Sequence, residues 1–249
     1  MPRLTVTELP SALPPSHLAV VIDVLRASTS IATALHSGAT AVIPVATIAA
    51  ARRAAAQVGN ALLAGERNAV RIAGFNLGNS PLEYTPAAVR GRVIVTTTTN
   101  GTRALAAAAK TARDVIVGSY VNFSGVLASV RAALGRGLDV AIVCAGSEGH
   151  LSLEDTACAG RFVRLALRGL PSRATVTLND AARAALLIEK PYVKSLARLF
   201  EHASHGRTLQ RGGFAADLAA CRALDTCPVV PRLVGRELRA RSPRRAPGR

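Results

Sequence analysis

Short apolar runs rich in valine and isoleucine alternate with helix-forming segments along the first two thirds of the chain. The apolar runs lie at residues 19–22, 41–45, 61–64, 93–95, 115–117 and 140–143, with a further candidate at 174–178. Three intervening segments have the length and composition of crossover helices, at 48–58, 103–109 and 123–134. This alternation predicts an α/β fold, a three-layer α/β/α arrangement around a largely parallel sheet.

The C-terminal portion follows a different, mainly helical pattern. Helices are predicted at 180–188, 191–202 and 214–223, with breaks at 204–206 and 211–213 and an extended segment at 228–233. No linker-like segment precedes this portion, so it is interpreted as a helical layer of the same unit. Residues 1–232 are therefore predicted to form a single α/β domain.

The last residues differ in composition from the rest. Between Arg232 and Arg249 there are seven arginines and one acid, with two prolines and little apolar content. This composition predicts a basic, disordered tail over residues 233–249. Truncation after Arg232 is accordingly expected to leave the function of the domain unchanged.

Charge and composition narrow the function classes. The net charge of +16 is compatible with nucleic-acid binding, but part of it lies in the predicted tail, and aromatic residues, which would stack on bases, make up only 3% of the chain. Cys144, Cys158, Cys221 and Cys227 lack the spacing of a zinc site or disulfide framework, which favours reduced thiols and a cytoplasmic location. No long apolar segment suggests a membrane span.

One segment stands out chemically. In residues 95–102 an apolar strand runs into four threonines, then Asn100, Gly101 and Thr102, and a helix follows. Free backbone N–H groups and the positive end of a helix dipole would converge there with several hydroxyls, which predicts an anion-binding site. Because β-branched threonines also suit a strand end, a purely structural role stays open.

Polar side chains follow other predicted strands at equivalent places. Asp23, Arg26, Ser28 and Thr29 come after the first apolar run. Glu66 and Arg67 follow the third run, and Glu154 and Asp155 open the helix after the sixth. Right-handed crossovers bring the carboxyl ends of parallel strands to one edge of the sheet, where α/β folds bind ligands. The sequence therefore predicts a site at that edge.

These segments, taken in order, resemble the 2-phosphosulfolactate phosphatase family. The resemblance rests on residues 22–29, 65–67, 74–81, 97–102 and 144–146 with 153–155, and more thinly on His205-Gly206, Gly213, Asp217-Leu218, Cys221 and Val230-Pro231. It implies a Mg²⁺-dependent phosphatase that removes phosphate from 2-phospho-3-sulfolactate, a step towards coenzyme M. Asn76 departs from the pattern, because an acid is expected at that position.

Mg²⁺ prefers oxygen ligands from a few carboxylates, and phosphoryl transfer needs positioning and charge stabilisation. The predicted metal ligands are Asp23, Glu66 and Asp155, and the predicted catalytic residues are Asp23, Arg26 and Glu154. A small anionic phosphate ester is expected to contact Arg26, Ser28, Thr29, Arg67, Asn79, Ser80, Thr98, Thr99, Asn100, Gly101 and Thr102.

Other functions and chemical routes stay open at this point. A noncatalytic anion-binding protein would need the threonine loop but not the carboxylates, and a basic nucleic-acid binder would need the tail. A phosphoenzyme formed on a hydroxyl is also compatible with the sequence. The oligomeric state is open, a homo-oligomer included.

Overall fold

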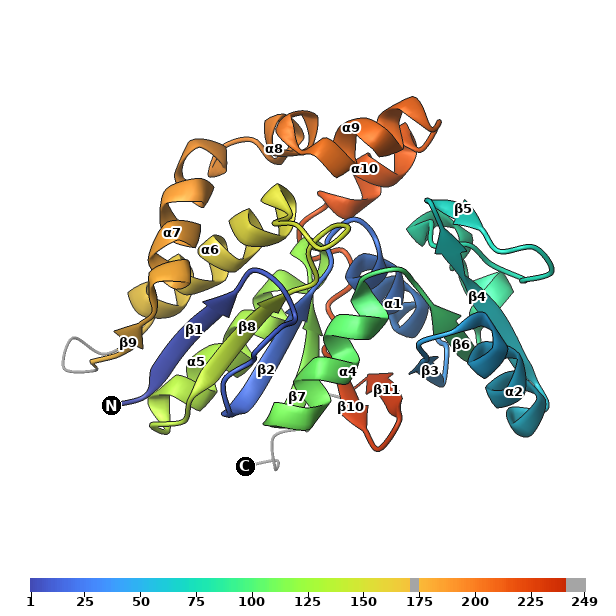
Figure 1. Ribbon diagram of the computed structural model, residues 1–249, viewed down its shortest axis with the longest axis horizontal. Coiled ribbons are helices and arrows are strands. Elements are labelled where there is room, and N and C mark those ends of the chain that lie inside the picture. The colour runs from blue at the N-terminus through green and yellow to red at the C-terminus, as the bar shows by residue number, and fades with distance from the viewer. Residues whose placement is uncertain (171–174, 241–249) are drawn as a thin grey trace, which may run out of the picture.

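The computed structural model describes residues 1–170 and 175–240. Within them, eleven strands form one sheet in the order β5-β4-β6-β3-β11-β10-β7-β2-β8-β1-β9 (Figure 1). The strands are β1 (Arg3–Thr7), β2 (Ser16–Ile22), β3 (Ala41–Pro44), β4 (Ala61–Arg67), β5 (Val70–Arg71), β6 (Val93–Thr97), β7 (Ala112–Gly118), β8 (Val140–Cys144), β9 (Thr177–Leu178), β10 (Pro231–Val234) and β11 (Glu237–Ala240). All six predicted strands are confirmed, and the candidate seventh is shortened to β9.

Helices cover both faces of the sheet. They are α1 (Ala27–His36), α2 (Ile48–Val58), α3 (Pro86–Val89), α4 (Gly101–Thr111), α5 (Phe123–Gly135), α6 (Leu153–Arg168), α7 (Asp180–Glu189), α8 (Leu196–His202), α9 (Ser204–Arg211) and α10 (Ala215–Cys221), with single turns η1 (Pro81–Glu83), η2 (Tyr120–Asn122) and η3 (Lys190–Tyr192). Leu18, Val20 and Ile22 of β2 pack with α5 and α6, whereas the alternate residues Ala19 and Val21 pack with α1 and α4. The predicted three-layer α/β fold is confirmed.

Parallel pairing positions the site. β2 pairs in parallel with β7 and β8, and β6 pairs in parallel with β3 and β4. The carboxyl ends of β4 and β6 therefore lie side by side, and three antiparallel pairings, β7–β10, β10–β11 and β11–β3, separate them from the part of the sheet that holds β2. The carboxyl ends of β2 and β8 lie together at one edge of that part. In Figure 1, α8, α9 and α10 lie across the top of the molecule above this edge.

The predicted tail is wrong for residues 233–240. β10 and β11 form an antiparallel hairpin that pairs with β7 on one side and β3 on the other, and so joins the two parallel parts of the sheet. Leu238 is fully buried in the core between α1 and α4 and the sheet. The sequence pattern is misleading because arginines surround this single core leucine. The rest of the predicted tail, 241–249, lies outside the described residues.

The C-terminal helices differ in two respects from the prediction. The helix predicted at 191–202 is divided into the turn η3 and α8, which begins at Leu196. Residues 204–206, predicted as a break, begin α9, and only Ala203 separates α8 from α9. Gly206 suits this tight junction, because a Cβ on it would lie 2.0 Å from the carbonyl oxygen of Phe200. The four cysteines are buried free thiols. None of the helices in the described ranges has the length and apolar character needed to cross a bilayer.

Candidate functional site

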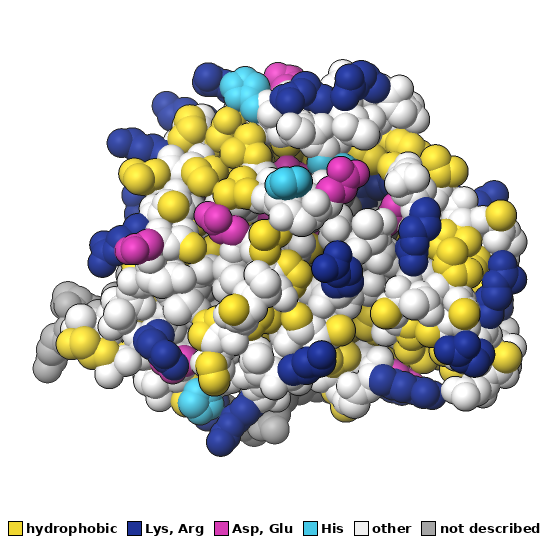
Figure 2. All heavy atoms as spheres, in the orientation of Figure 1, with side chains coloured by type: hydrophobic (Ala, Val, Ile, Leu, Met, Phe, Trp, Pro, Cys, Tyr) yellow, Lys and Arg dark blue, Asp and Glu magenta, His cyan; other side chains and the backbone are white. Residues whose placement is uncertain are grey.

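A cavity of about 270 Å³ opens at the carboxyl edge of the sheet, beneath α9. Figure 2 shows acidic and histidine side chains gathered below the upper helices, with lysines and arginines spread around this face. The cavity is lined by Asp23, Leu25, Arg26, Glu66, Asn68, Ala69, Asn79, Thr98, Thr99, Asn100, Ser147, Glu148, Ser204, His205 and Thr208. The sequence prediction is confirmed in that residues following β2, β4, β6 and β8 meet in one place.

Asp23 lies directly after β2 and is buried. Its Oδ1 accepts a hydrogen bond from the Ala27 amide at 3.2 Å, and its Oδ2 faces Gly101, where a Cβ would lie 2.8 Å from it. Burial raises the pKa of Asp23 to about 7; the Ala27 bond opposes this, and the nearby charges of Glu66 and Glu154 add to it. A cation at this carboxylate would relieve both the desolvation and the repulsion.

Glu66 is the last residue but one of β4 and lies opposite the threonine loop. Its Oε1 accepts hydrogen bonds from the amide of Thr99 at 2.9 Å and from its hydroxyl at 3.0 Å, and its Oε2 accepts from the Ala69 amide at 3.0 Å. Three donors hold the carboxylate in one orientation while it still lines the cavity. The threonine loop thus orients an acid at the cavity wall.

Asp155 does not line the cavity, unlike the other two predicted metal ligands. Its Oδ1 accepts from the Val24 amide at 2.8 Å, which fixes the turn after Asp23. Burial raises the pKa of Asp155 well above its ordinary value, and the charge of Asp23 adds to this rise. In the described part of the chain no three His, Cys, Asp or Glu side chains are grouped to hold a metal ion. The predicted trio is therefore reduced to Asp23 and Glu66.

A pair of carboxylates still fits Mg²⁺. This ion is commonly held by one or two carboxylates together with substrate phosphate oxygens and waters, without a complete cage of protein ligands. Asp23 and Glu66 share the cavity and interact electrostatically, and their oxygens are of the type that Mg²⁺ prefers. The donor set consequently suits an ion that completes its shell with substrate and water.

Arg26 lines the cavity but its guanidinium is already engaged. Its Nη1 donates to Asp217 at 2.6 Å, its Nη2 donates to the Ala69 carbonyl at 2.9 Å, and it stacks over Phe214. Asp217 also accepts from the Ser80 hydroxyl at 2.6 Å. The buried ion pair between Arg26 and Asp217 thus joins the start of α1 to α10. The Nε atom of Arg26 has no hydrogen-bond partner among the described residues.

Asp217 was missed as a site residue by sequence reasoning. It lies in the first turn of α10, where an acid also suits the helix dipole, so its position alone does not mark it as a site residue. An acid on an otherwise apolar short helix was the available clue.

Several predicted substrate contacts instead stabilise the edge of the sheet. The Ser28 hydroxyl accepts from the Asp23 amide, and the Thr29 hydroxyl donates to the Val24 carbonyl. Arg67 donates to the Glu66 carbonyl and to the Thr97 hydroxyl. Asn76, where an acid was expected, accepts from the Leu63 amide. None of these four side chains lines the cavity.

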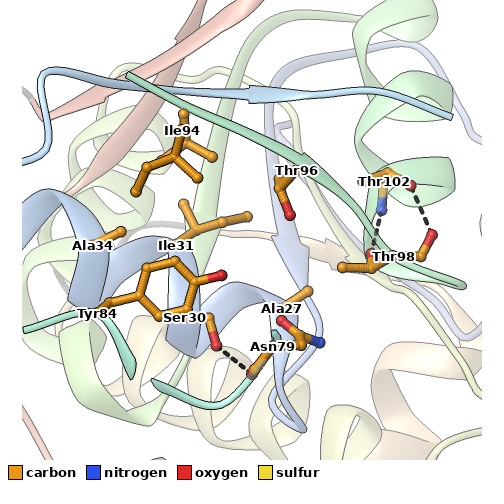
Figure 3. Close-up of a pocket in the computed structure, with 11 residues that line it drawn as sticks. Ala27, Ser30, Ile31, Ala34, Asn79, Tyr84, Ile94, Thr96, Thr98 and Thr102 are labelled. Carbon is orange, nitrogen blue, oxygen red and sulfur yellow. Dashed lines mark hydrogen bonds between the residues drawn. The ribbon is translucent and has the colours of Figure 1, made fainter. Parts of the chain in front are cut away.

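The threonine loop turns into α4 between the cavity and a small neighbouring space. The Thr98 hydroxyl accepts from the Thr102 amide, and the Thr102 hydroxyl donates to the Thr98 carbonyl. Figure 3 shows Thr98 and Asn79 beside a space of about 10 Å³ whose far side is formed by Ile31 and Ile94. That volume holds about one water molecule, which is too small for a phosphate ester.

Glu154 lies deeper than a catalytic residue was expected to lie, and Cys144 is a buried thiol. Glu154 is 3% exposed and lines an adjoining hollow of about 340 Å³, not the cavity itself. Burial raises the pKa of Glu154, and the charge of His205 opposes this rise. Burial also raises the pKa of the Cys144 thiol well above its ordinary range, which agrees with a packing role.

A family model described as 2-phosphosulpholactate phosphatase matches residues 4–236. The chain belongs to this family. It is 44% identical over 221 residues to a probable 2-phosphosulfolactate phosphatase of Symbiobacterium thermophilum, covering 86% of this chain and 90% of that protein. A protein of the same description from Deinococcus radiodurans is 38% identical over 232 residues, 93% of each chain. The resemblance predicted from the motifs is confirmed, and membership of a family of phosphoric monoester hydrolases with it.

Proposed function

We propose that the protein hydrolyses 2-phospho-3-sulfolactate, or a related 2-hydroxy-acid phosphate ester, to the hydroxy acid and inorganic phosphate, with Mg²⁺ as cofactor. The family match over residues 4–236 carries the proposal. The cavity supports it, because carboxylates, hydroxyls and the start of α4 meet there.

The charge balance of the cavity supports the cofactor. Asp23, Glu66 and Glu148 line it, whereas Arg26 is already paired with Asp217. An anionic ester would meet net negative charge in such a cavity unless a cation were bound. Mg²⁺ at Asp23 and Glu66 would neutralise phosphate oxygens and the charge that develops on them.

The remaining residues orient this arrangement. Thr99 and Ala69 hold the Glu66 carboxylate, and Asp155 holds the turn that carries Asp23. Asn100 precedes α4, whose positive dipole end favours an anion at the cavity. The α9 residues Ser204 and Thr208 cover the cavity from above and reduce its access to water.

We expect the protein to release phosphate from 2-phosphosulfolactate or 2-phospholactate only when a divalent ion is present. An excess of chelator should abolish the release and added Mg²⁺ should restore it, because the cavity otherwise repels the substrate. Phosphate release from a panel of 2-hydroxy-acid phosphates, with and without chelator, measures this. Full activity in chelator contradicts the cofactor proposal; no release from any ester favours the alternative of a noncatalytic anion-binding protein.

Thr99→Val should weaken the metal site without removing a ligand. The variant loses the hydroxyl bond to Glu66 but keeps the amide bond, and one hydrogen bond contributes about 0.5–1.5 kcal/mol. The Mg²⁺ concentration for half-maximal activity should therefore rise by about 3- to 10-fold. Thr40→Val, an exposed threonine away from the cavity, is the control, and an equal shift in both variants would contradict the role of Thr99.

Three further expectations belong to this proposal. They are a role in coenzyme M biosynthesis, a cytoplasmic location, which the four free thiols favour, and a small anionic phosphate ester as the binding partner.

A further inference from the structure

His205 is placed at the cavity by the junction between α8 and α9. It is the second residue of α9, is partly exposed, and lines both the main cavity and the adjoining hollow. No hydrogen bond of its ring to another described side chain or backbone group is present, so both ring nitrogens are available.

The local backbone fixes this position. Gly206 packs against Phe200, where any side chain would collide with the Phe200 carbonyl oxygen. Phe200 and Leu209 are buried in the core, which anchors α8 and α9 on either side of the histidine. On the hollow side, buried Glu154 interacts electrostatically with His205. The ring is therefore held between an acid and the space for the substrate.

Ester hydrolysis needs a proton donor that the rest of the cavity does not supply. An alkoxide is a poor leaving group unless it is protonated as the P–O bond breaks. Among the described residues that line the cavity, Arg26 and His205 are the side chains able to carry positive charge, and an arginine does not release its proton. Asp23 and Glu66 face the proposed cation, and Glu148 is an exposed carboxylate.

We propose that His205 is the general acid of the reaction, an inference that rests on the proposed phosphatase function. The water oxygen bonds to phosphorus while the bond between phosphorus and the ester oxygen breaks, and the electron pair of that bond stays on the ester oxygen. The His205 imidazolium transfers its N–H proton to this oxygen. The products are the hydroxy acid, dihydrogen phosphate and neutral His205, which regains a proton from solvent through the hollow.

The test compares leaving groups in His205→Gln. General acid catalysis contributes roughly 10²-fold or more, so kcat/KM for 2-phosphosulfolactate or 2-phospholactate should fall by about that factor. With 4-nitrophenyl phosphate, whose leaving phenolate needs no proton, the fall should stay within about 3-fold. Inhibition by inorganic phosphate and the unfolding temperature should match those of the wild type, because glutamine preserves size and polarity.

His202→Gln is the matched control. His202 lies on the same pair of helices, but its ring is bonded to Tyr192 and does not line the main cavity. A second experiment uses His205→Ala with added imidazole, which should restore hydrolysis of the alkyl ester, 2-phosphosulfolactate or 2-phospholactate. This experiment tests the general-acid role if the aryl ester, 4-nitrophenyl phosphate, is not a substrate.

Equal losses for both ester types, or unchanged alkyl-ester hydrolysis in a folded His205 variant, would overturn the general-acid role, as would absence of imidazole rescue. A wild type that hydrolyses no ester would overturn the proposed function instead. The two failures are thus distinguishable.

Discussion

A protein carrying Asp23→Asn is expected to lose about 10³-fold or more in kcat, equivalent to about 4 kcal/mol of transition-state stabilisation. Asp23 is one of two carboxylates proposed to hold Mg²⁺, and a neutral amide cannot balance the charge of the cation. The substitution keeps the fold because the amide oxygen of asparagine can still accept from the Ala27 amide. The loss therefore reports on the charge and not on local structure.

The same variant should be more stable than the wild type in chelator at alkaline pH. Folding raises the pKa of Asp23 from 3.8 to about 7, so between these values the folded state binds more protons than the unfolded state. Stability is then greatest below the unfolded pKa and is lost as the pH rises through the folded pKa, by about 1.4 kcal/mol for each unit of the shift. Asparagine does not ionise, so the stability of the variant does not fall in this way.

Thermal unfolding in chelator between about pH 5 and pH 8, beside steady-state kinetics with Mg²⁺, measures both effects. Asp139→Asn is the control, since its pairing with Arg3 lowers the pKa of Asp139 and its replacement should give no gain in alkaline stability. Turnover near that of the wild type in folded Asp23→Asn would show that this acid has no part in catalysis. An unchanged unfolding temperature at high pH would contradict the burial argument.

The sequence predicted the placement of Asp23, Glu66 and the threonine loop because parallel topology determines it. Each follows a strand whose apolar run is unambiguous, and β4 and β6 pair in parallel, so that Glu66 and the threonine loop lie side by side. The antiparallel hairpin between β3 and β7 was not predicted, yet Asp23 lines the same cavity. Local pattern and chain topology agree at these positions, and the prediction needed no knowledge of side-chain packing.

Side-chain pairing across long sequence distances was not predictable in this way. Arg26 appeared to be a clamp for the substrate, but its partner Asp217 is 191 residues away on a short helix. Asp155 was predicted to be a metal ligand like Asp23. Its carboxylate instead accepts a hydrogen bond from the Val24 amide and does not line the cavity. Residue type and strand position do not distinguish a carboxylate that faces a cavity from one that is hydrogen-bonded to the backbone outside it.

The prediction for the C-terminal hairpin was wrong for a related reason. A composition window over residues 232–249 averages the hairpin with the basic residues around it, and so conceals a strand, β11, that has a neighbouring strand on each edge and one buried leucine. Truncation after Arg232, which the sequence predicted to be harmless, is consequently expected to be destabilising.

Truncation after Arg232 should now prevent stable folding. It removes β11 and half of β10, and with them the pairing of β11 with β3, the strand connection from β3 to β7, and the fully buried Leu238. Loss of one core leucine alone costs about 2–5 kcal/mol, and the exposed edges of β3 and β7 add to this. Because domains are stable by only about 5–15 kcal/mol, the folded state should be largely lost.

Truncation after Ala240 is the matched control, because it shortens the basic segment but keeps every residue of the hairpin. Circular dichroism and thermal unfolding should show a folded protein there, and Leu238→Ala in the full chain should fall between the two. A truncation after Arg232 that unfolds at the wild-type temperature would mean that the hairpin is not needed to join the two parallel parts. The graded series separates loss of the leucine side chain from loss of the strand. Only removal of the strand breaks the connection between β3 and β7 at the centre of the sheet, while β3 stays paired with β6 and β7 with β2.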